Sequence, residues 1–273
     1  MRVWFITGAS SGFGRAIADA ALARGDAVVA AGRDVETLRA LGDDDRVLAA
    51  RLDVTDATER EGAVAAALDR FGRIDVLVNN AGRTQVGAVE ETTDDELRAL
   101  FDLHVFGPFA LTRAVLPHMR ERGSGHIVQL SSMGGVSANP GHAVYATSKF
   151  ALEGASEALA GEVAPFGIRV TIVEPGPFRT DFAGRSMQAS TPMAAYAGTP
   201  ARGARDRFRD QDGVQPGDPA RGAAAIIATV RAPAAPLRLP LGKEAVARIR
   251  TKLERQLADM ESTMARTLST AYP

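Results

Sequence analysis

The stretch VWFITGASSGFG, residues 3–14, decides the fold of this chain. It opens with a continuous apolar run, residues 3–6, which is typical of a parallel strand buried on both faces. Glycines and hydroxyl residues follow, and then a helical stretch that contains Ile17, Ala18 and Leu22. A glycine-rich turn between strand and helix predicts a phosphate cradle, because glycine lets the backbone approach the ligand and the helix start offers free N–H groups. The spacing is Gly-x-x-x-Gly-x-Gly, so a plain tight turn is the alternative.

The alternation of strand and helix continues along the chain. Segments of helical length separate most of the later apolar runs, and residues 57–71 and 94–120 carry apolar side chains at helical spacing. Repeated strand–helix–strand units predict an α/β fold: a single Rossmann-type domain over residues 1–273, with a doubly wound parallel sheet and helices on both faces. The further predicted strands are residues 27–31, 47–52, 74–78, 127–130, 168–173 and 237–241, and the later helices are 145–165, 219–230 and 243 to about 260.

Residues 183–220 interrupt this pattern. They are rich in Gly, Pro, Ala, Ser and Arg and show no strong periodicity. Long irregular segments of compact domains are either functional or unstructured, so this one is either a substrate loop that serves as a lid or a surface insertion. The apolar residues in and near it suggest an adaptable, apolar pocket. They are Phe178, Phe182, Met187, Met193 and Tyr196.

Composition excludes several classes of function. Lys and Arg number 32 against 33 Asp and Glu, so no overall field attracts nucleic acid or an anionic membrane. There is no cysteine, and the four histidines lack a metal-ligand spacing, so no metal site is expected. The first strand follows Met1 directly and apolar runs such as residues 223–228 are short, which predicts a cytoplasmic protein without signal peptide or transmembrane segment. The expected partners are a small-molecule substrate and further copies of the chain.

The end of the second predicted strand bears on the choice of nucleotide. An acid about 20 residues after the glycines binds a ribose 2′-hydroxyl, whereas a 2′-phosphate requires a cation. Here the strand ends at Gly32 and Arg33 follows, whose guanidinium can form charge-assisted bonds to phosphate. The sequence therefore favours NADP over NAD. In the alternative, Asp34 binds the ribose and Arg33 is a solvated loop charge.

A second motif, YATSK at residues 145–149, begins the helix predicted over 145–165. Tyr145 and Lys149 are four residues apart and share one helix face. A nearby ammonium favours the phenolate, so Lys149 is expected to lower the pKa of Tyr145 toward neutrality, where the phenol exchanges protons efficiently. Ser132 follows a predicted strand at the sheet edge where doubly wound folds bind ligands, and it is placed to hydrogen-bond a substrate oxygen. In the structural alternative, Ser132 caps or bridges a turn, and the Tyr145/Lys149 pair is an exposed helix start.

Over residues 1–182 the sequence resembles the short-chain dehydrogenase/reductase family. The matching pieces are residues 7–14, Asp53-Val54, Asn79-Asn80-Ala81-Gly82, Ser132, the Tyr145/Lys149 pair, and Pro175-Gly176 followed by Thr180. The resemblance implies an NAD(P)-dependent oxidoreductase that interconverts an alcohol and a ketone or aldehyde, with Ser132, Tyr145 and Lys149 as catalytic residues. Together with Arg33, the expected nucleotide-binding residues are Gly8, Ser10, Ser11, Gly12, Phe13, Gly14, Asp53, Val54, Asn80, Ala81, Gly82, Tyr145, Lys149, Pro175, Gly176 and Thr180.

The same resemblance implies individual roles. Ser10 and the glycine loop hold phosphates, Asp53 and Val54 meet the adenine, and residues 79–82 support the nucleotide wall. Lys149 also contacts the nicotinamide ribose, while Thr180 binds the carboxamide or a phosphate.

His104 departs from the family pattern. The family usually has asparagine here, holding a water that links the catalytic lysine to solvent. Histidine donates, accepts and carries protons, so His104 is a candidate fourth catalytic residue that keeps an altered relay. In the alternative, His104 is a helix-core histidine satisfied by a backbone carbonyl.

Two other functions compete with the enzyme. A catalytically silent NADP-binding sensor or scaffold would use the same fold, but such proteins typically lose the tyrosine or lysine that this chain keeps. A sugar-nucleotide epimerase or dehydratase would carry a larger C-terminal domain than the residues after Pro177 provide.

The resemblance also bears on substrate and assembly. The stretch PGPFRT, residues 175–180, resembles the hydroxysteroid- and retinol-dehydrogenase-like branch of the family, which favours an apolar substrate. Long helices such as 94–120 and 145–165 commonly pack against a second copy in this family, so a homodimer or homotetramer is expected.

Overall fold

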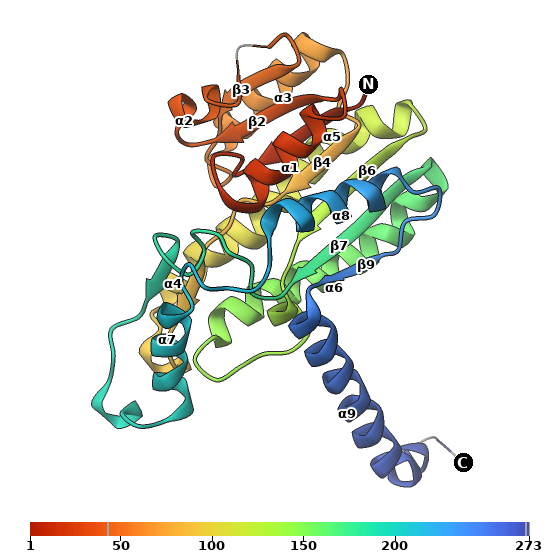
Figure 1. Ribbon diagram of the computed structural model, residues 1–273. Helices are drawn as coiled ribbons and strands as arrows, with labels where there is room; N and C mark the ends of the chain where they lie inside the picture. Colours follow the sequence, from red (N-terminus) through yellow and green to blue (C-terminus); the bar gives the residue numbers. More distant parts are fainter. Residues whose placement is uncertain (43, 271, 273) are drawn as a thin grey trace.

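The computed structural model describes residues 1–42, 44–270 and 272. At its centre lies a seven-stranded sheet with the order β3-β2-β1-β4-β6-β7-β9, in which every neighbouring pair is parallel (Figure 1). The strands are β1 (Val3–Thr7), β2 (Ala27–Gly32), β3 (Val47–Arg51), β4 (Val76–Asn79), β6 (Gly125–Leu130), β7 (Ile168–Pro175) and β9 (Arg238–Leu241). The prediction of a doubly wound parallel sheet is confirmed, because each predicted apolar run forms one of these strands.

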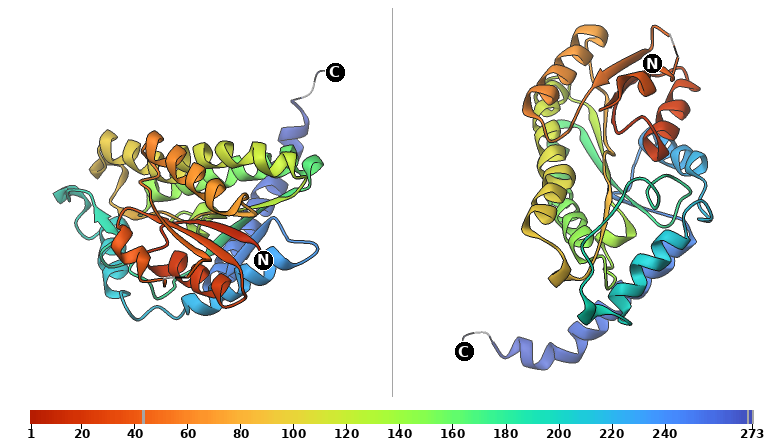
Figure 2. Two further views of the ribbon diagram at one scale, coloured as in Figure 1. Left: turned by 90° about the horizontal axis from the view of Figure 1, so that it is seen from above. Right: turned by 90° about the vertical axis from the view of Figure 1, so that its left-hand side faces the viewer.

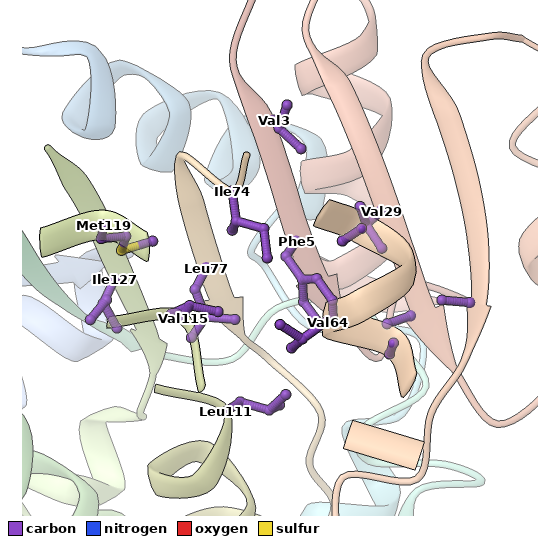
Figure 3. Packing of buried hydrophobic residues seen from close by; sticks show 14 of the residues in the cluster. Val3, Phe5, Val29, Val64, Ile74, Leu77, Leu111, Val115, Met119 and Ile127 are labelled. Atoms are coloured by element: carbon purple, nitrogen blue, oxygen red, sulfur yellow. The ribbon is translucent and has the colours of Figure 1, made fainter. Parts of the chain in front are cut away.

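Helices cover both faces of the sheet (Figure 2). The described helices are α1 (Gly12–Leu22), α2 (Val35–Arg39), α3 (Ala57–Phe71), α4 (Asp94–Phe101), α5 (Gly107–Glu121), α6 (Ala143–Val163), α7 (Pro200–Asp210), α8 (Pro219–Arg231) and α9 (Lys243–Leu268). On one face, α3 and α5 bury Val64 and Leu111 against Phe5 and Leu77 of the strands (Figure 3). On the other face, α1 and α8 pack against the alternate strand side chains. Both faces are therefore buried, which explains the unbroken apolar runs of the sequence.

The segment predicted as one helix over 94–120 is interrupted. A π-helical turn, η2 (Asp102–Phe106), joins α4 to α5. Gly107 follows this turn and packs closely against the backbone of Val54. A Cβ added to Gly107 would lie 2.7 Å from the carbonyl oxygen of Val54. By length and composition alone, residues 94–121 are apolar enough to cross a bilayer, a stretch that the short apolar runs noted in the sequence do not include. Leu100, Leu111 and Val115 are fully buried against the rest of the chain, as in the core helix of a folded domain.

Residues 183–220 contain more regular structure than the sequence predicts. β8 (Met187–Ala189) pairs in parallel with β5 (Thr84–Val86), about a hundred positions earlier in the chain, and α7 follows. The Thr199 hydroxyl caps α7 by accepting a hydrogen bond from the Arg202 amide. The segment is thus a folded unit beside the carboxyl ends of the strands.

The C-terminal helix α9 is longer than predicted and ends at Leu268 rather than near residue 260. Its first turns are anchored by buried Ala245 and Ile249, while the rest projects from the body of the molecule (Figure 1). Leu257 and Met260 on the projecting part are exposed.

Candidate active site

A cavity of about 880 Å³ opens at the carboxyl ends of the central strands. The loop before α1 forms one wall, the ends of β4 and β6 form the floor, and residues from the 177–215 segment form the opposite wall. All of the predicted nucleotide-binding residues line this cavity except Gly14, which lies behind the loop. Of the four predicted catalytic residues, the cavity brings together Ser132, Tyr145 and Lys149 but not His104.

The glycine loop has the shape that a phosphate cradle requires. Gly8 has φ +66°, and a Cβ at this position would lie 3.0 Å from the Ala81 backbone. A Cβ on Gly14 would lie 2.2 Å from the Gly8 carbonyl oxygen, so no other residue fits without moving the loop. The loop leads into α1, and Gly12 and Phe13 of its first turn line the cavity, so the N–H groups and positive dipole end of the helix lie at the cavity. The structure therefore fits a bound pyrophosphate.

Thr7 and Asn80 fix the loop from below. The Thr7 hydroxyl accepts hydrogen bonds from the amides of Asn80 and Ala81, both at 2.9 Å. In return, the Asn80 side-chain amide donates to the carbonyl oxygens of Thr7 and Gly8, at 2.8 and 3.2 Å. On the outer side of the loop, a Cβ on Gly12 would lie 3.3 Å from Thr180. The predicted motifs at the ends of β1, β4 and β7 thus meet at the glycine loop.

The side chains at the end of β2 separate the two nucleotide hypotheses. Asp34 is committed to α2, because its carboxylate accepts from the Thr37 hydroxyl at 2.6 Å and from the Glu36 amide at 3.1 Å. Arg33 is exposed and lines the cavity. Its charge lies close enough to Asp53 to help lower the pKa of that carboxyl, although burial opposes this and hydrogen bonds from Thr55 contribute more. Asp34 also lines the cavity, but its carboxylate is engaged by α2, so Arg33 is the charged group of this pair that is available to a ligand.

The three catalytic candidates come from two neighbouring segments. Ser132 follows β6 and caps the short helix η3 (Met133–Gly135), accepting from the Gly134 amide at 3.0 Å. Ser132 Oγ and the Tyr145 ring converge on Gly134, where a Cβ would lie 3.3 Å from each. Lys149 lies one turn beyond Tyr145 on α6, and its Nζ is 5.9 Å from the centre of the Tyr145 ring. The predicted convergence of hydroxyl, phenol and ammonium is present.

The predicted effect of Lys149 on Tyr145 is wrong. Burial raises the pKa of Tyr145 to about 12, and the neighbouring Ser132 hydroxyl offsets only part of this. Burial also lowers the pKa of Lys149 to about 7, with Glu153 opposing. Lys149 donates to the carbonyl oxygen of Leu130 at 2.7 Å, so its ammonium is directed to the strand end rather than to the phenol oxygen. Desolvation therefore outweighs the charge effect that the four-residue spacing suggests.

His104 is buried within the π-helical turn η2. Its Nε2 accepts from the Arg83 amide at 3.3 Å, so Nδ1 carries the proton and donates to Ser148 Oγ at 2.8 Å. Ser148 in turn donates to the Tyr145 carbonyl oxygen at 2.8 Å. Burial and the charges of Lys149 and Arg83 lower the pKa of His104 well below its usual value. Both ring nitrogens are thus used within the protein, which supports a core histidine, although its partners are a backbone amide and a hydroxyl rather than the expected backbone carbonyl.

The substrate side of the cavity is aromatic. Phe182 packs edge-on against Tyr145 at 5.8 Å, Phe208 against Phe182 at 6.2 Å, and His142 against Phe208 at 5.4 Å, measured between ring centres. Of the five apolar residues expected here, Phe178 and Phe182 line the cavity, whereas Met187, Met193 and Tyr196 do not. Sequence reasoning missed Phe208 and His142, because no motif marks them and α7 brings Phe208 to the site.

Comparisons with known proteins agree with this geometry. A family model described as short chain dehydrogenase matches residues 2–190. Oxidoreductase BOA17 from Botryotinia fuckeliana is 42% identical over 248 residues, covering 90% of each chain. A crystal structure of a short-chain dehydrogenase from Streptomyces avermitilis has a TM-score of 0.93 at 50% identity and covers 99% of this chain and 98% of its own. The closed form of a serine dehydrogenase, complexed with NADP⁺, has a TM-score of 0.75 at 27% identity and covers 88% of this chain and 94% of its own.

Fold, site and relatives define an NAD(P)-dependent oxidoreductase with a Rossmann-like sheet. Within that class, the chain belongs to the short-chain dehydrogenase family. The resemblance read from its motifs is thereby confirmed.

Proposed function

We propose that this enzyme transfers hydride between NADP(H) and an alcohol/ketone pair whose carbon skeleton is apolar or aromatic. The observation that carries the proposal is the convergence of Ser132, Tyr145 and Lys149 in one cavity whose other wall is the glycine loop. The nucleotide, when bound, supplies or accepts the hydride. The exposed guanidinium of Arg33 at the cavity favours NADP, and the serine dehydrogenase of the same fold was solved with NADP⁺.

The side chains have separate tasks in the proposed reduction. Negative charge grows on the substrate oxygen as hydride arrives, and the Ser132 hydroxyl donates a hydrogen bond to it. Tyr145 then gives its phenolic proton to that oxygen. Because burial raises the pKa of Tyr145 to about 12, the phenol holds its proton throughout the neutral range and is ready as the acid. Oxidation runs the same steps in reverse.

We further propose that residues 183–220 act as a lid over the substrate. In support, Gln188, Phe208 and Gln215 from this segment line the cavity, and the pairing of β8 with β5 ties the segment to the site. The aromatic chain from Tyr145 through Phe182 to Phe208 favours ketones that carry a ring or another flat apolar group.

A panel of aromatic, steroid, retinoid and short aliphatic ketones with NADPH, and of the matching alcohols with NADP⁺, tests the proposal. We expect turnover with at least one aromatic or polycyclic ketone. Tyr145→Phe should keep NADPH affinity and lose turnover by roughly 100- to 10,000-fold, because the phenol acts only when charge develops on the substrate oxygen. A Tyr145→Phe enzyme as active as the wild type would contradict the proposed role of Tyr145 as proton donor. Nucleotide binding without any turnover would favour the silent sensor instead.

A further inference from the structure

The projecting part of α9 carries a row of apolar side chains, here called the α9 stripe. Its members follow one another at spacings of three and four residues, so they share one face of the helix. They are Leu253, Leu257, Met260, Met264 and Leu268. These residues are between 45% and 71% exposed, although side chains of this kind are usually buried. A contiguous apolar surface of this sort marks a contact site.

The body of the molecule does not support this part of the helix. Every residue from 253 to 270 is exposed, and the helix stands away from the sheet and its covering layers (Figures 1 and 2). Residues 253–268 make only about four turns, and a helix of that length is marginal in water by itself. Tertiary packing of an apolar face is what usually stabilises such a helix. A partner on the α9 stripe supplies the packing that the body does not.

Charged side chains border the α9 stripe on both sides, and their sign changes along the helix. At about 3.6 residues per turn, Arg250 and Glu261 fall on one border of the stripe, and Lys252 and Asp259 fall on the other. On each border the cation lies nearer the start of the helix and the anion nearer its end. In the part of the chain that the structure describes, none of these four residues forms an ion pair.

A second copy of α9 that runs in the opposite direction complements both the stripe and the charges. A two-fold axis perpendicular to the two helices places the same border of each helix side by side. If the axis passes between residues 255 and 256, Arg250 lies opposite Glu261 of the second copy. The same axis places Lys252 opposite Asp259 of the second copy. Each border then holds two pairs of opposite charges, and the two stripes face each other.

The parallel arrangement of the two helices is less favourable. It brings the two different borders together, so that Asp259 lies between Glu254 and Glu261 of the second copy. Like charges at the edges of a helix pair repel, and such edge charges select the orientation of paired helices. The charge pattern therefore favours the antiparallel pair.

A membrane surface matches the polar side of this helix less well than a second copy does. Helices that lie on anionic membranes are rich in Lys and Arg on the polar face. Residues 250–268 instead mix cations and anions in nearly equal number. The cations are Arg250, Lys252, Arg255 and Arg266, and the anions are Glu254, Asp259 and Glu261. A partner of mixed charge fits this surface.

We propose that α9 pairs antiparallel with α9 of a second copy of the chain, with the two α9 stripes buried between the helices and ion pairs along both edges. Residues 250–268 do not line the substrate cavity, so the pairing is independent of the proposed reaction. It is also separate from the contact expected at the long helices α5 and α6. The two contacts together join four copies.

Single cysteines report the direction of the pair, because the chain has none of its own. Gln256→Cys, close to the two-fold axis, should give a disulfide-linked dimer under mild oxidation, and Val246→Cys combined with Met264→Cys should also link two chains. Met264→Cys alone should not link to itself, since the two copies of this position lie about 26 Å apart along an antiparallel pair. Arg255→Cys, on the opposite face, is the control and should stay unlinked. Self-linking of Met264→Cys, or none of Gln256→Cys, would overturn the proposal.

The mass of the assembly tests the stripe and the charges. Leu257→Glu should halve the mass that light scattering gives for the wild type at micromolar concentration, because each copy loses one contact. Arg250→Glu/Lys252→Glu should also halve it, since like charges then face each other on both borders. Adding Asp259→Lys and Glu261→Lys to that double variant reverses both signs and should restore the wild-type mass.

Arg255→Glu, an equal change of charge on the opposite face of α9, is the matched control and should leave the mass unchanged. All these substitutions lie on the projecting part of the helix, and thermal unfolding should show that the body keeps its stability. A Leu257→Glu protein with the wild-type mass, or a charge-exchanged protein that stays at the lower mass, would overturn the proposal. Sedimentation of the wild type with phosphatidylglycerol vesicles, abolished by Leu257→Glu while the mass in solution stays unchanged, would assign the stripe to a membrane instead.

Discussion

At the residue scale, Arg33 is the side chain that we expect to direct nucleotide choice. It is exposed at the cavity, while its neighbour Asp34 is occupied in capping α2. A guanidinium binds a phosphate with charge-assisted, bidentate hydrogen bonds that a ribose hydroxyl cannot match. We therefore expect the position of this charge, and not the shape of the glycine loop, to set the preference for NADP over NAD.

Arg33→Asp tests this charge directly. The wild type should bind NADPH at least about tenfold more tightly than NADH, equivalent to about 1.4 kcal/mol, and the variant should erase or invert that difference. Dissociation constants from fluorescence titration with both nucleotides provide the measurement. Arg24→Asp on a loop away from the cavity is the matched charge change. Equal dissociation constants for NADPH and NADH in the wild type would contradict a role of Arg33 in nucleotide choice.

Tyr145 and Lys149 show which properties of single residues the sequence predicts and which it does not. Their common helix face follows from a four-residue spacing, and the structure bears it out. Their protonation does not follow, because the pKa of each group depends on burial under residues that are remote in sequence, such as Phe182. Local motifs therefore locate the chemistry, but the electrostatics require the folded chain.

At the scale of elements, the π-helical turn η2 explains the histidine that departs from the family pattern. The wider turn brings His104 between the Arg83 amide and the Ser148 hydroxyl, directly behind Tyr145. A periodic apolar pattern over residues 94–120 cannot reveal one extra residue in a turn, so the sequence predicts a continuous helix. The same limit applies to the β5–β8 pair, because its strands are three residues long and far apart in the chain. It also applies to α7, in which arginines dominate and the apolar face consists of little more than alanine and Phe208.

His104→Ala tests whether this turn relays protons or only holds the site together. We expect a loss of about 1–3 kcal/mol in unfolding free energy, because the Arg83 amide and Ser148 lose a buried partner. The shape of the pH–rate profile should stay unchanged, and His104→Asn should retain substantial activity. Urea unfolding and initial rates from pH 6 to 9 provide the data. A stable His104→Ala enzyme with an altered pH–rate profile would support the hypothesis that His104 relays protons.

At the scale of the whole molecule, the free energy of unfolding depends on pH because buried histidines stay neutral in the folded chain. His126 on β6 is 2% exposed and pairs with Thr171 at 2.9 Å, and burial lowers its pKa to about 3. The unfolded chain takes up this proton below its ordinary pKa of about 6.5, whereas the folded chain does not. Unfolding free energy should therefore fall as pH drops from about 6.5 toward 3, by about 1.4 kcal/mol per pH unit for this group. His126→Gln should reduce the slope by that amount in urea unfolding at several pH values. A slope equal to that of the wild type would mean that His126 is not the group responsible.

The assembly of the molecule depends on the outer faces of α5 and α6, which lie in the same layer over the sheet (Figure 2). Phe109 on α5 and Phe150 on α6 are 44% and 43% exposed, although aromatic rings of this size are usually buried. Covering them with the same surface of a second copy removes this area from water, so we expect a homodimer or homotetramer. Phe150→Glu should shift the species seen by light scattering at micromolar concentration toward the 28.7 kDa monomer. Val214→Glu, an equally apolar-to-charged change at an exposed position away from these helices, should leave the assembly intact. A wild type that is monomeric under these conditions would show that the two phenylalanines serve another contact.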